Sequence, residues 1–292
     1  MSNLDIRPLT PDLGAEIYGL DLRQKSIAAP AIKEALARYG VIFLRDQTLS
    51  LDELVDGTAA IGPILRVPFV KGMQSHPDVI AVLKEADERK ISTFGGTWHS
   101  DFSFLPTPPS LTLLYAAELP SVGGDTIWAN QYAAYDALSS GMKALLDPLR
   151  AVHIGTPHGT MGPGAGAATS RSIQMVRNDP AADREILHPV VRVHPVTGRK
   201  ALFINQVYTQ RFENMTIAES RPLLDYLYQH STSPEFCCRW HWHPGTLAVW
   251  DNRCTLHLAI NDYDGVRRLL YRTTVEGEIP IAVDQSKQTK VA

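Results

Sequence analysis

His99 and Asp101 form a His-x-Asp pattern, which is a local arrangement that can bind a metal ion. Residues two apart in an extended chain point to the same side, so both side chains can reach one ion. Two histidines and one carboxylate suit a non-haem iron(II) centre, because they leave three positions open for a cosubstrate and O₂. Trp98, Phe102 and Phe104 flank the pair, and such aromatic walls indicate a pocket rather than a surface turn.

The same pattern occurs a second time, at His76-Pro77-Asp78. Proline favours a turn there, and we expect Asp78 to close the turn rather than bind a metal. A third ligand for the first pair has to come from a distant part of the chain. The histidines available are His188, His194, His230, His241, His243 and His257. We interpret His241 and His243 as an exposed strand edge whose neighbouring tryptophans face the core.

Two arginines near the C-terminus could bind anions. Arg268 and Arg272 have the same parity within an apolar stretch, so a strand would direct both guanidinium groups to one face. Two arginines inside a β-structure are costly unless they meet negative charge, and the guanidinium fork suits a carboxylate. The alternative for Arg272 is a surface pair with Glu276, which would contribute little.

The elements that must position these residues are mostly short strands. Helices are expected at residues 30–39, with Pro30 near the start and Gly40 at the end, at 51–61 and at 214–230. A short buried strand is expected at 41–44. Further strands are expected at 79–83, 111–116, 190–194, 201–205, 246–250 and 268–275, with a hairpin at Thr197-Gly198. Many short strands with few helices predict a mainly β fold, a sandwich or jelly roll with helices outside.

Residues 155–187 differ from the rest of the chain. They are rich in Gly, Ala, Pro and Ser and show no sustained periodicity. An insert of this length is usually functional or disordered, so it is either a mobile active-site lid or a surface loop.

The composition excludes several classes of protein. The chain has 292 residues, 44% of them hydrophobic, and a formal charge of −3 without a basic stripe, so we do not expect it to bind nucleic acid. No apolar run is long enough to span a bilayer, so we do not expect a membrane span either. The N-terminus lacks the pattern of a secretory signal. The three cysteines are an odd set with an adjacent pair, which favours the reducing cytoplasm over a disulfide scaffold.

The chain resembles the taurine dioxygenase and 2,4-dichlorophenoxyacetate dioxygenase family of iron(II)/2-oxoglutarate-dependent oxygenases. The resemblance extends from about residue 6 to about residue 280, and its motifs occur in the family's order. The stretches that carry it are Leu13-Gly14-Ala15-Glu16-Ile17, Gly19-Leu20-Asp21-Leu22, Trp98-His99-Ser100-Asp101, Gly123-Gly124-Asp125-Thr126, Trp250-Asp251-Asn252-Arg253-Cys254-Thr255-Leu256-His257 and Arg268 to Arg272.

The resemblance implies one double-stranded β-helix (jelly-roll) domain over residues 1–292 that requires iron(II), 2-oxoglutarate and O₂. Such enzymes convert 2-oxoglutarate to succinate and CO₂ while they hydroxylate a substrate. The implied iron ligands are His99, Asp101 and His257, the implied residues for the distal carboxylate of 2-oxoglutarate are Thr126 and Arg268, and the implied substrate residue is Arg272. From the residues alone, Thr126 is equally well an ordinary turn threonine.

The sequence departs from taurine dioxygenase near the substrate. Residues 67–71 lack that enzyme's histidine, and Gly95 replaces an asparagine. Residues 205–211 are similar to aryloxypropionate (dichlorprop-type) dioxygenases. We therefore expect a small organic anion with an apolar body, such as an aryloxyalkanoate or an alkyl sulfate, with taurine or another sulfonate as the alternative. The expected pocket residues are Phe69, Val70, Gly95, Phe102 and Phe104, with the anion at Arg272.

Two alternatives come from other classes of protein. Two histidines and an acid also suit zinc, which would give a zinc-dependent hydrolase that needs neither O₂ nor a keto acid. The other alternative is a non-catalytic jelly-roll sensor. The combination of the three ligands with two inward arginines favours the oxygenase. By the same resemblance we expect a homodimer or homotetramer.

Overall fold

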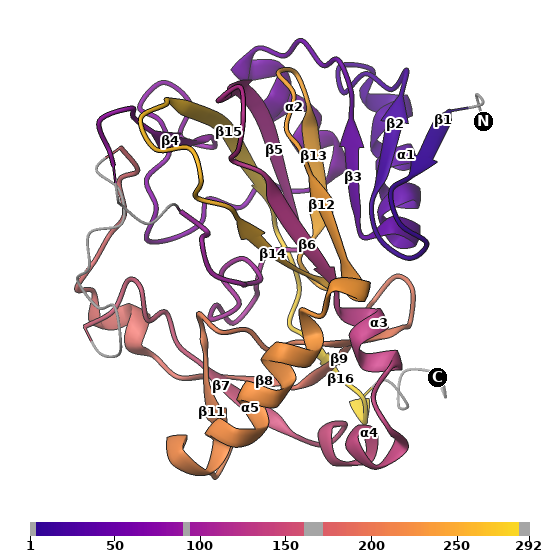
Figure 1. Cartoon of the computed structure of the whole chain (residues 1–292), viewed down its shortest axis with the longest axis vertical. Helices are drawn as coiled ribbons and strands as arrows, with labels where there is room; N and C mark the ends of the chain where they lie inside the picture. Colours follow the sequence, from indigo (N-terminus) through magenta and orange to yellow (C-terminus); the bar gives the residue numbers. More distant parts are fainter. Residues whose placement is uncertain (1–3, 90–93, 161–171, 286–292) are drawn as a thin grey trace.

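The computed structural model describes residues 4–89, 94–160 and 172–285. A seven-stranded sheet with the order β1-β2-β3-β13-β5-β15-β4 runs through the upper half of the molecule (Figure 1). Its strands are β1 (Asp5–Pro8), β2 (Ala15–Tyr18), β3 (Val41–Leu44), β13 (Leu247–Asp251), β5 (Leu111–Glu118), β15 (Arg268–Val275) and β4 (Ile80–Lys84). Neighbouring strands are antiparallel except β2 and β3, which are parallel.

Strand β3 shows how both faces of this sheet are covered. Its four residues are apolar and fully buried. Ile42 and Leu44 pack against helices α1 (Lys25–Tyr39) and α2 (Leu51–Ile61) on one face. Val41 and Phe43 point to the opposite face, because successive side chains of a strand alternate. A continuous apolar run is therefore the pattern that this position requires.

A second sheet lies against the Phe43 face. It has the order β12-β6-β14, with β12 (Cys237–Trp240), β6 (Thr126–Asn130) and β14 (Thr255–Ala259). Phe43 stacks on Trp240 with ring centroids 4.0 Å apart, and Trp128 contacts Phe43 edge-on. The large sheet and this small sheet thus enclose one aromatic core, which is the sandwich arrangement that the sequence predicts.

The lower half of the molecule carries a second core (Figure 1). Its strands are β7 (Arg150–His153), β8 (Ile186–Pro189) and β11 (Thr209–Phe212) in one sheet, and β9 (Val191–Val193), β10 (Lys200–Leu202) and β16 (Ile281–Ala282) in another. Its helices are α3 (Gln131–Asp136), α4 (Ser140–Leu146) and α5 (Ile217–Ser231), with the short 3₁₀ turns η1 (Pro180–Asp183) and η2 (Pro234–Phe236). Leu224 and Leu227 of α5 pack against Phe212 and Leu202 in this core.

The predicted elements are confirmed, with shifts at their ends. Helix α5 starts at Ile217 rather than 214, because Thr216 caps it in a capping box with Glu219. Helix α1 starts at Lys25, so Pro30 lies inside the helix and not near its start. The buried Ala28 and Ala29 of this additional turn belong to the core. The predicted hairpin at Thr197-Gly198 joins the antiparallel strands β9 and β10.

The structure describes only part of the predicted insert at 155–187, because residues 161–171 lie outside the described residues. Its described parts are not without structure: they contain η1, and the insert ends within β8. No helix in the described part of the chain is long and apolar enough to cross a membrane.

Candidate metal centre and active site

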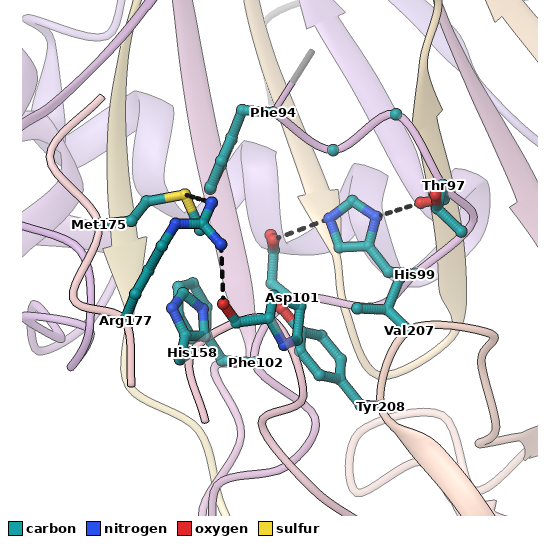
Figure 2. A pocket seen from close by; sticks show the side chains of 13 residues that line it. Phe94, Thr97, His99, Asp101, Phe102, His158, Met175, Arg177, Val207 and Tyr208 are labelled. Atoms are coloured by element: carbon teal, nitrogen blue, oxygen red, sulfur yellow. Dashed lines mark hydrogen bonds and ion pairs between the residues drawn. The ribbon is translucent and has the colours of Figure 1, made fainter. Parts of the chain in front are cut away.

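His99, Asp101 and His257 form one buried cluster. Their ligand atoms all lie within 4.8 Å of one another. His99 Nε2 is 3.6 Å and His257 Nε2 is 3.8 Å from Asp101 Oδ1. Figure 2 shows the imidazole of His99 directed at the Asp101 carboxylate. The structure thus brings the predicted third histidine to the predicted His-x-Asp pair, with a donor set of the type that iron(II) accepts.

Backbone pairing brings the two histidines together. His99 and His257 exchange both of their backbone hydrogen bonds, at 3.1 and 2.8 Å. His257 lies on β14, so this pairing fixes the otherwise irregular segment around His99 to the small sheet. His99 Nδ1 donates to the carbonyl oxygen of Thr97 at 2.8 Å. In the neutral ring this leaves the lone pair on Nε2, the atom that faces the cluster.

The protonation states of the cluster suit a metal ion. Burial lowers the pKa of His257 well below its usual value, and His99 lowers it further, so the imidazole is neutral at pH 7. Burial raises the pKa of Asp101, but Arg272 and the two histidines outweigh that effect and hold this pKa far below its usual range. A neutral imidazole and a carboxylate are the forms that coordinate metals. His257 Nδ1 has no hydrogen-bond partner among the described residues.

A network of polar side chains holds Asp101 from behind. Thr112 Oγ1 donates to Asp101 Oδ2 at 2.7 Å. Asn252 Nδ2 donates to Thr112 Oγ1 at 2.9 Å, and Asn252 Oδ1 accepts from Trp250 Nε1 at 2.9 Å. Ser100 Oγ donates to the carbonyl oxygen of Asn252. Thr112 was not predicted as a site residue, because a threonine inside an apolar strand gives no distinctive signal.

Thr126 and Arg268 lie at the starts of β6 and β15 and are both buried. Thr126 Oγ1 accepts from Trp242 Nε1 at 3.0 Å. Arg268 Nη2 donates to the carbonyl oxygen of Gly124 at 3.0 Å, whereas its Nε has no hydrogen-bond partner. Arg268 forms no ion pair within the described residues, and burial lowers its pKa. A buried guanidinium of this kind fits the carboxylate of an organic acid.

Arg272 lies beside the cluster. Its Nη2 is 3.1 Å from Asp101 Oδ2, and its guanidinium carbon is 5.5 Å from the ring centroid of Phe102. The ion pair is not aligned as a hydrogen bond, because Nη2 and Nε both lack a hydrogen-bond partner. Arg272 borders a cavity of about 400 Å³ together with Val70 and Lys71. Glu276, the surface partner considered from the sequence, forms no ion pair with Arg272 in the described structure.

A second cavity, of about 170 Å³, opens directly onto His99 and Asp101 (Figure 2). Of the predicted pocket residues, Gly95 and Phe102 line it. Phe69 and Phe104 stand next to it, because both contact the ring of the lining residue His158. The predicted pocket residues therefore lie around the two cavities. Val70 lines the cavity that Arg272 borders and not the one beside His99.

Other residues that line the cavity were not predicted as pocket residues. Among them are His158, Met175, Arg177 and Tyr208. His158, Met175 and Arg177 belong to the insert 155–187, which has no periodicity that could place a side chain. Burial lowers the pKa of His158 to about 4, so its ring is neutral at pH 7.

Comparison with known proteins decides the family. The sequence model of the taurine catabolism dioxygenase TauD, TfdA family matches residues 5–274. The chain belongs to this family. It is 35% identical to an alpha-ketoglutarate-dependent sulfate ester dioxygenase of Pseudomonas putida, over 96% of the chain and 92% of the relative. It is 32% identical to the alpha-ketoglutarate-dependent 2,4-dichlorophenoxyacetate dioxygenase of Cupriavidus pinatubonensis, over 91% and 96%.

A solved structure gives the same result for the fold. A taurine dioxygenase from Burkholderia xenovorans superposes with a TM-score of 0.79 at 32% identity, covering 97% of this chain and 94% of the other. The predicted jelly roll and the predicted enzyme class are confirmed: this TauD, TfdA family member is an iron(II)/2-oxoglutarate-dependent dioxygenase that uses O₂. The family favours neither the zinc hydrolase nor the sensor.

Proposed function

We propose that His99, Asp101 and His257 are the iron ligands of this dioxygenase. The cluster that they form supports this assignment, because it is buried, contains a carboxylate and a neutral imidazole, and has the composition of the two-histidine, one-carboxylate centre. Iron(II) in this position supplies the O₂ chemistry that converts 2-oxoglutarate to succinate and CO₂. The protein supplies the geometry, through the His99–His257 backbone pair and the Asn252–Thr112 network.

We propose further that Thr126 and Arg268 bind the distal carboxylate of 2-oxoglutarate. Arg268 supports this role because it is a buried cation whose Nε has no hydrogen-bond partner. Gly124 leaves room for it: a Cβ atom there would lie 3.1 Å from Arg268 Nε. Thr126 is opposite Ala259, which follows His257 by two residues, so the small sheet connects the proposed acid site to the proposed iron site.

For the substrate we propose a small organic anion with an apolar body, with alkyl sulfates first and aryloxyalkanoates second. The single observation that carries this order is the match to the sulfate ester dioxygenase over nearly the whole of both chains. The cavity beside His99 has aromatic and aliphatic walls, including Phe94, Phe102 and Val207, which suit an apolar body. We propose Arg272, Phe69, Val70, Gly95 and Phe102 as the residues around the substrate.

Hydroxylation of an alkyl sulfate at the carbon that bears the ester oxygen leads to cleavage. The hydroxylated carbon loses sulfate as the C–O bond breaks, and an aldehyde remains. One O₂ and one 2-oxoglutarate are consumed, and succinate, CO₂, aldehyde and sulfate are formed. The residues of the chain contribute by holding the reacting carbon near the iron and by keeping water out of the apolar cavity.

Taurine is the alternative substrate, and a solved taurine dioxygenase is among the similar structures. Two positions argue against it here. Gly95, which lines the cavity, has no side chain to bind a polar group, and residues 67–71 contain no histidine. A zwitterion such as taurine also gains little from apolar walls.

We propose that residues 1–292 act as one domain and that the protein is a homodimer or homotetramer of the cytoplasm. The free state of all three cysteines supports a reducing compartment. Light scattering coupled to gel filtration measures the oligomeric state directly. The closing of residues 155–187 over the substrate stays a prediction, and protease sensitivity with and without substrate tests it.

The decisive experiment measures succinate formation by the iron(II)-loaded protein with 2-oxoglutarate and O₂. Alkyl sulfates, aryloxypropionates, alkyl sulfonates and taurine are compared as stimulants. His257→Ala is expected to abolish the activity and metal binding together. His76→Ala is the matched control, because His76 belongs to the other His-x-Asp pattern and lies outside the metal cluster. No stimulation by any anion, or equal loss in both variants, contradicts the proposal.

A further inference from the structure

Trp242 contacts both residues of the proposed 2-oxoglutarate site. Its indole Nε1 donates to Thr126 Oγ1 at 3.0 Å. Its ring also lies near Arg268, whose guanidinium carbon is 5.8 Å from the ring centroid. Trp242 is buried and follows the end of β12 by two residues. The sequence predicts only that this tryptophan faces the core, whereas the structure places it against the polar pair.

Asp125, the residue before Thr126, fixes the segment that carries Trp242. Arg239 Nε donates to Asp125 Oδ2 at 2.7 Å, and His241 Nδ1 donates to Asp125 Oδ1 at 2.8 Å. The carboxylate is buried, whereas the side chains of Arg239 and His241 are both more exposed than buried. Because residues 239 and 241 face outward in an extended chain, residue 242 faces the interior.

The direction of the hydrogen bond from Trp242 determines what Thr126 can do. An indole N–H only donates, so the threonine oxygen is the acceptor in this contact. The single hydroxyl proton of Thr126 then has no acceptor among the described residues. A hydroxyl in this arrangement is ready to donate to an anion, and a carboxylate is a strong acceptor.

The ring of Trp242 also restricts Arg268. The guanidinium carbon of Arg268 is 5.6 Å from the ring centroid of Tyr263 as well, so two aromatic rings lie within 6 Å of it. Such rings stabilise a guanidinium and limit its conformations, but they carry no net charge. Its Nη2 donates to the neutral carbonyl of Gly124. The aromatic contacts therefore orient the cation and leave its charge for the distal carboxylate.

We propose that Trp242 is a positioning residue for 2-oxoglutarate. Its N–H makes the Thr126 hydroxyl a donor, and its ring orients the guanidinium of Arg268, so that both groups donate to the distal carboxylate. This inference rests on the proposed function, from which it takes the roles of Thr126 and Arg268. Trp242 acts through these two residues and not by contact with the cosubstrate.

Binding measurements test this role separately from turnover. Calorimetry with manganese(II)-loaded protein and no O₂ gives the Kd of 2-oxoglutarate. Trp242→Phe keeps a buried ring but removes the N–H, and it is expected to weaken 2-oxoglutarate about 3- to 10-fold, the net value of one hydrogen bond. The same substitution should cost less in a Thr126→Val background, because the hydroxyl through which the N–H acts is then absent.

A keto acid without the distal carboxylate separates positioning from general damage. 2-Oxopentanoate keeps the keto-acid end of 2-oxoglutarate but has a methyl group in place of the distal carboxylate. Its Kd should be the same in the wild type and in Trp242→Phe. The Kd of manganese(II) should also be the same, because the substitution lies outside the metal cluster.

Trp240→Phe is the matched control. Trp240 is buried and stacks on Phe43, but its Nε1 has no hydrogen-bond partner among the described residues. This variant removes the same N–H without removing a contact, so its Kd for 2-oxoglutarate should equal that of the wild type.

Three results overturn the inference alone, provided that Thr126→Val weakens 2-oxoglutarate. They are an unchanged Kd in Trp242→Phe, an equal loss in Trp240→Phe, and an equal weakening of 2-oxopentanoate. The proposed function fails, and the inference with it, if the wild type does not bind 2-oxoglutarate. The same holds if Thr126→Val and Arg268→Gln both leave its Kd unchanged, since the distal carboxylate then binds elsewhere.

Discussion

Arg272 and Asp101 form an ion pair in the interior of the protein, with Nη2 of the arginine 3.1 Å from Oδ2 of the aspartate. Arg272 is 3% exposed and Asp101 is 1% exposed. The pair connects β15 to the His-x-Asp segment, so a sheet residue balances the charge of the proposed iron ligand. Burial raises the pKa of Asp101, and Arg272 makes the largest of the contributions that together outweigh this effect.

Arg272→Met tests how much the metal-free protein depends on this pair. The variant leaves a buried carboxylate without its cation, which costs about 3–5 kcal/mol. Urea unfolding of the metal-free protein measures the loss of stability. Saturating manganese(II) should restore part of this stability, because the bound cation neutralises the carboxylate of Asp101. Arg66→Met is the control, because the pair of Arg66 with Asp78 is exposed and its removal should change stability little. Equal effects of both variants contradict the prediction.

Asn252→Ala tests whether the network behind Asp101 positions this proposed iron ligand. The substitution removes the amide oxygen that accepts from Trp250 Nε1 and the amide nitrogen that donates to Thr112 Oγ1. We expect a loss of about 1–3 kcal/mol in unfolding free energy and about 10- to 100-fold weaker manganese(II) binding. A double-mutant cycle with Thr112→Val separates the shared contact, since coupled residues are not additive. Strict additivity would show that Asn252 does not act through Thr112.

Residues with local periodicity were predictable from the sequence. The apolar stretch at residues 268–275 predicted the bounds of β15, and the shared parity of Arg268 and Arg272 predicted that both face the interior, where both are buried. Trp240 and Trp242 are buried between exposed histidines, as predicted, although β12 already ends at Trp240. The His-x-Asp pair was equally visible, because strand geometry relates its two members.

The third proposed ligand and the insert were not predictable in the same way. His257 meets His99 through backbone pairing between segments that are far apart in the chain, and only the family resemblance selected it from six histidines. Arg177 is placed by pairing between residues 174–176 and 69–71, which both lack a regular pattern. Tertiary contacts of this kind leave no periodic trace in the sequence.

His188 makes stability depend on pH. Burial lowers its pKa to about 4, and its Nε2 donates to the carbonyl oxygen of Leu105 at 2.9 Å. The unfolded chain binds a proton near pH 6.5 and the folded protein does not, so stability falls as the pH drops below about 6.5 and levels off near 4. His188 alone should lower the free energy of unfolding by about 2 kcal/mol between pH 7.5 and pH 5.

Unfolding by urea at both pH values measures this dependence in the wild type and in His188→Gln. Glutamine keeps a donor for Leu105 but does not titrate, so the difference between the two pH values should shrink by about 2 kcal/mol. His76→Gln, which alters a partly exposed histidine outside this core, should keep the wild-type dependence. An unchanged dependence in His188→Gln would assign the acid sensitivity to other groups.

Gly124 connects backbone conformation to the proposed 2-oxoglutarate site. Its φ of +72° is in the left-handed region, and a Cβ atom there would lie 3.1 Å from Arg268 Nε. Gly124→Ala should therefore have two effects. The first is a loss of about 1–2 kcal/mol in stability from the backbone. The second is a displaced guanidinium, with about tenfold weaker 2-oxoglutarate binding.

Gly19→Ala separates these two effects. Gly19 has nearly the same φ, +74°, but a Cβ atom there meets nothing within 4 Å. It should show the same loss of stability in urea unfolding and a wild-type Kd for 2-oxoglutarate, measured with the manganese(II)-loaded protein. If both alanine variants bind 2-oxoglutarate like the wild type, Arg268 does not need the space that Gly124 leaves. If both alanine variants weaken 2-oxoglutarate binding equally, general destabilisation and not the Arg268 contact explains the effect.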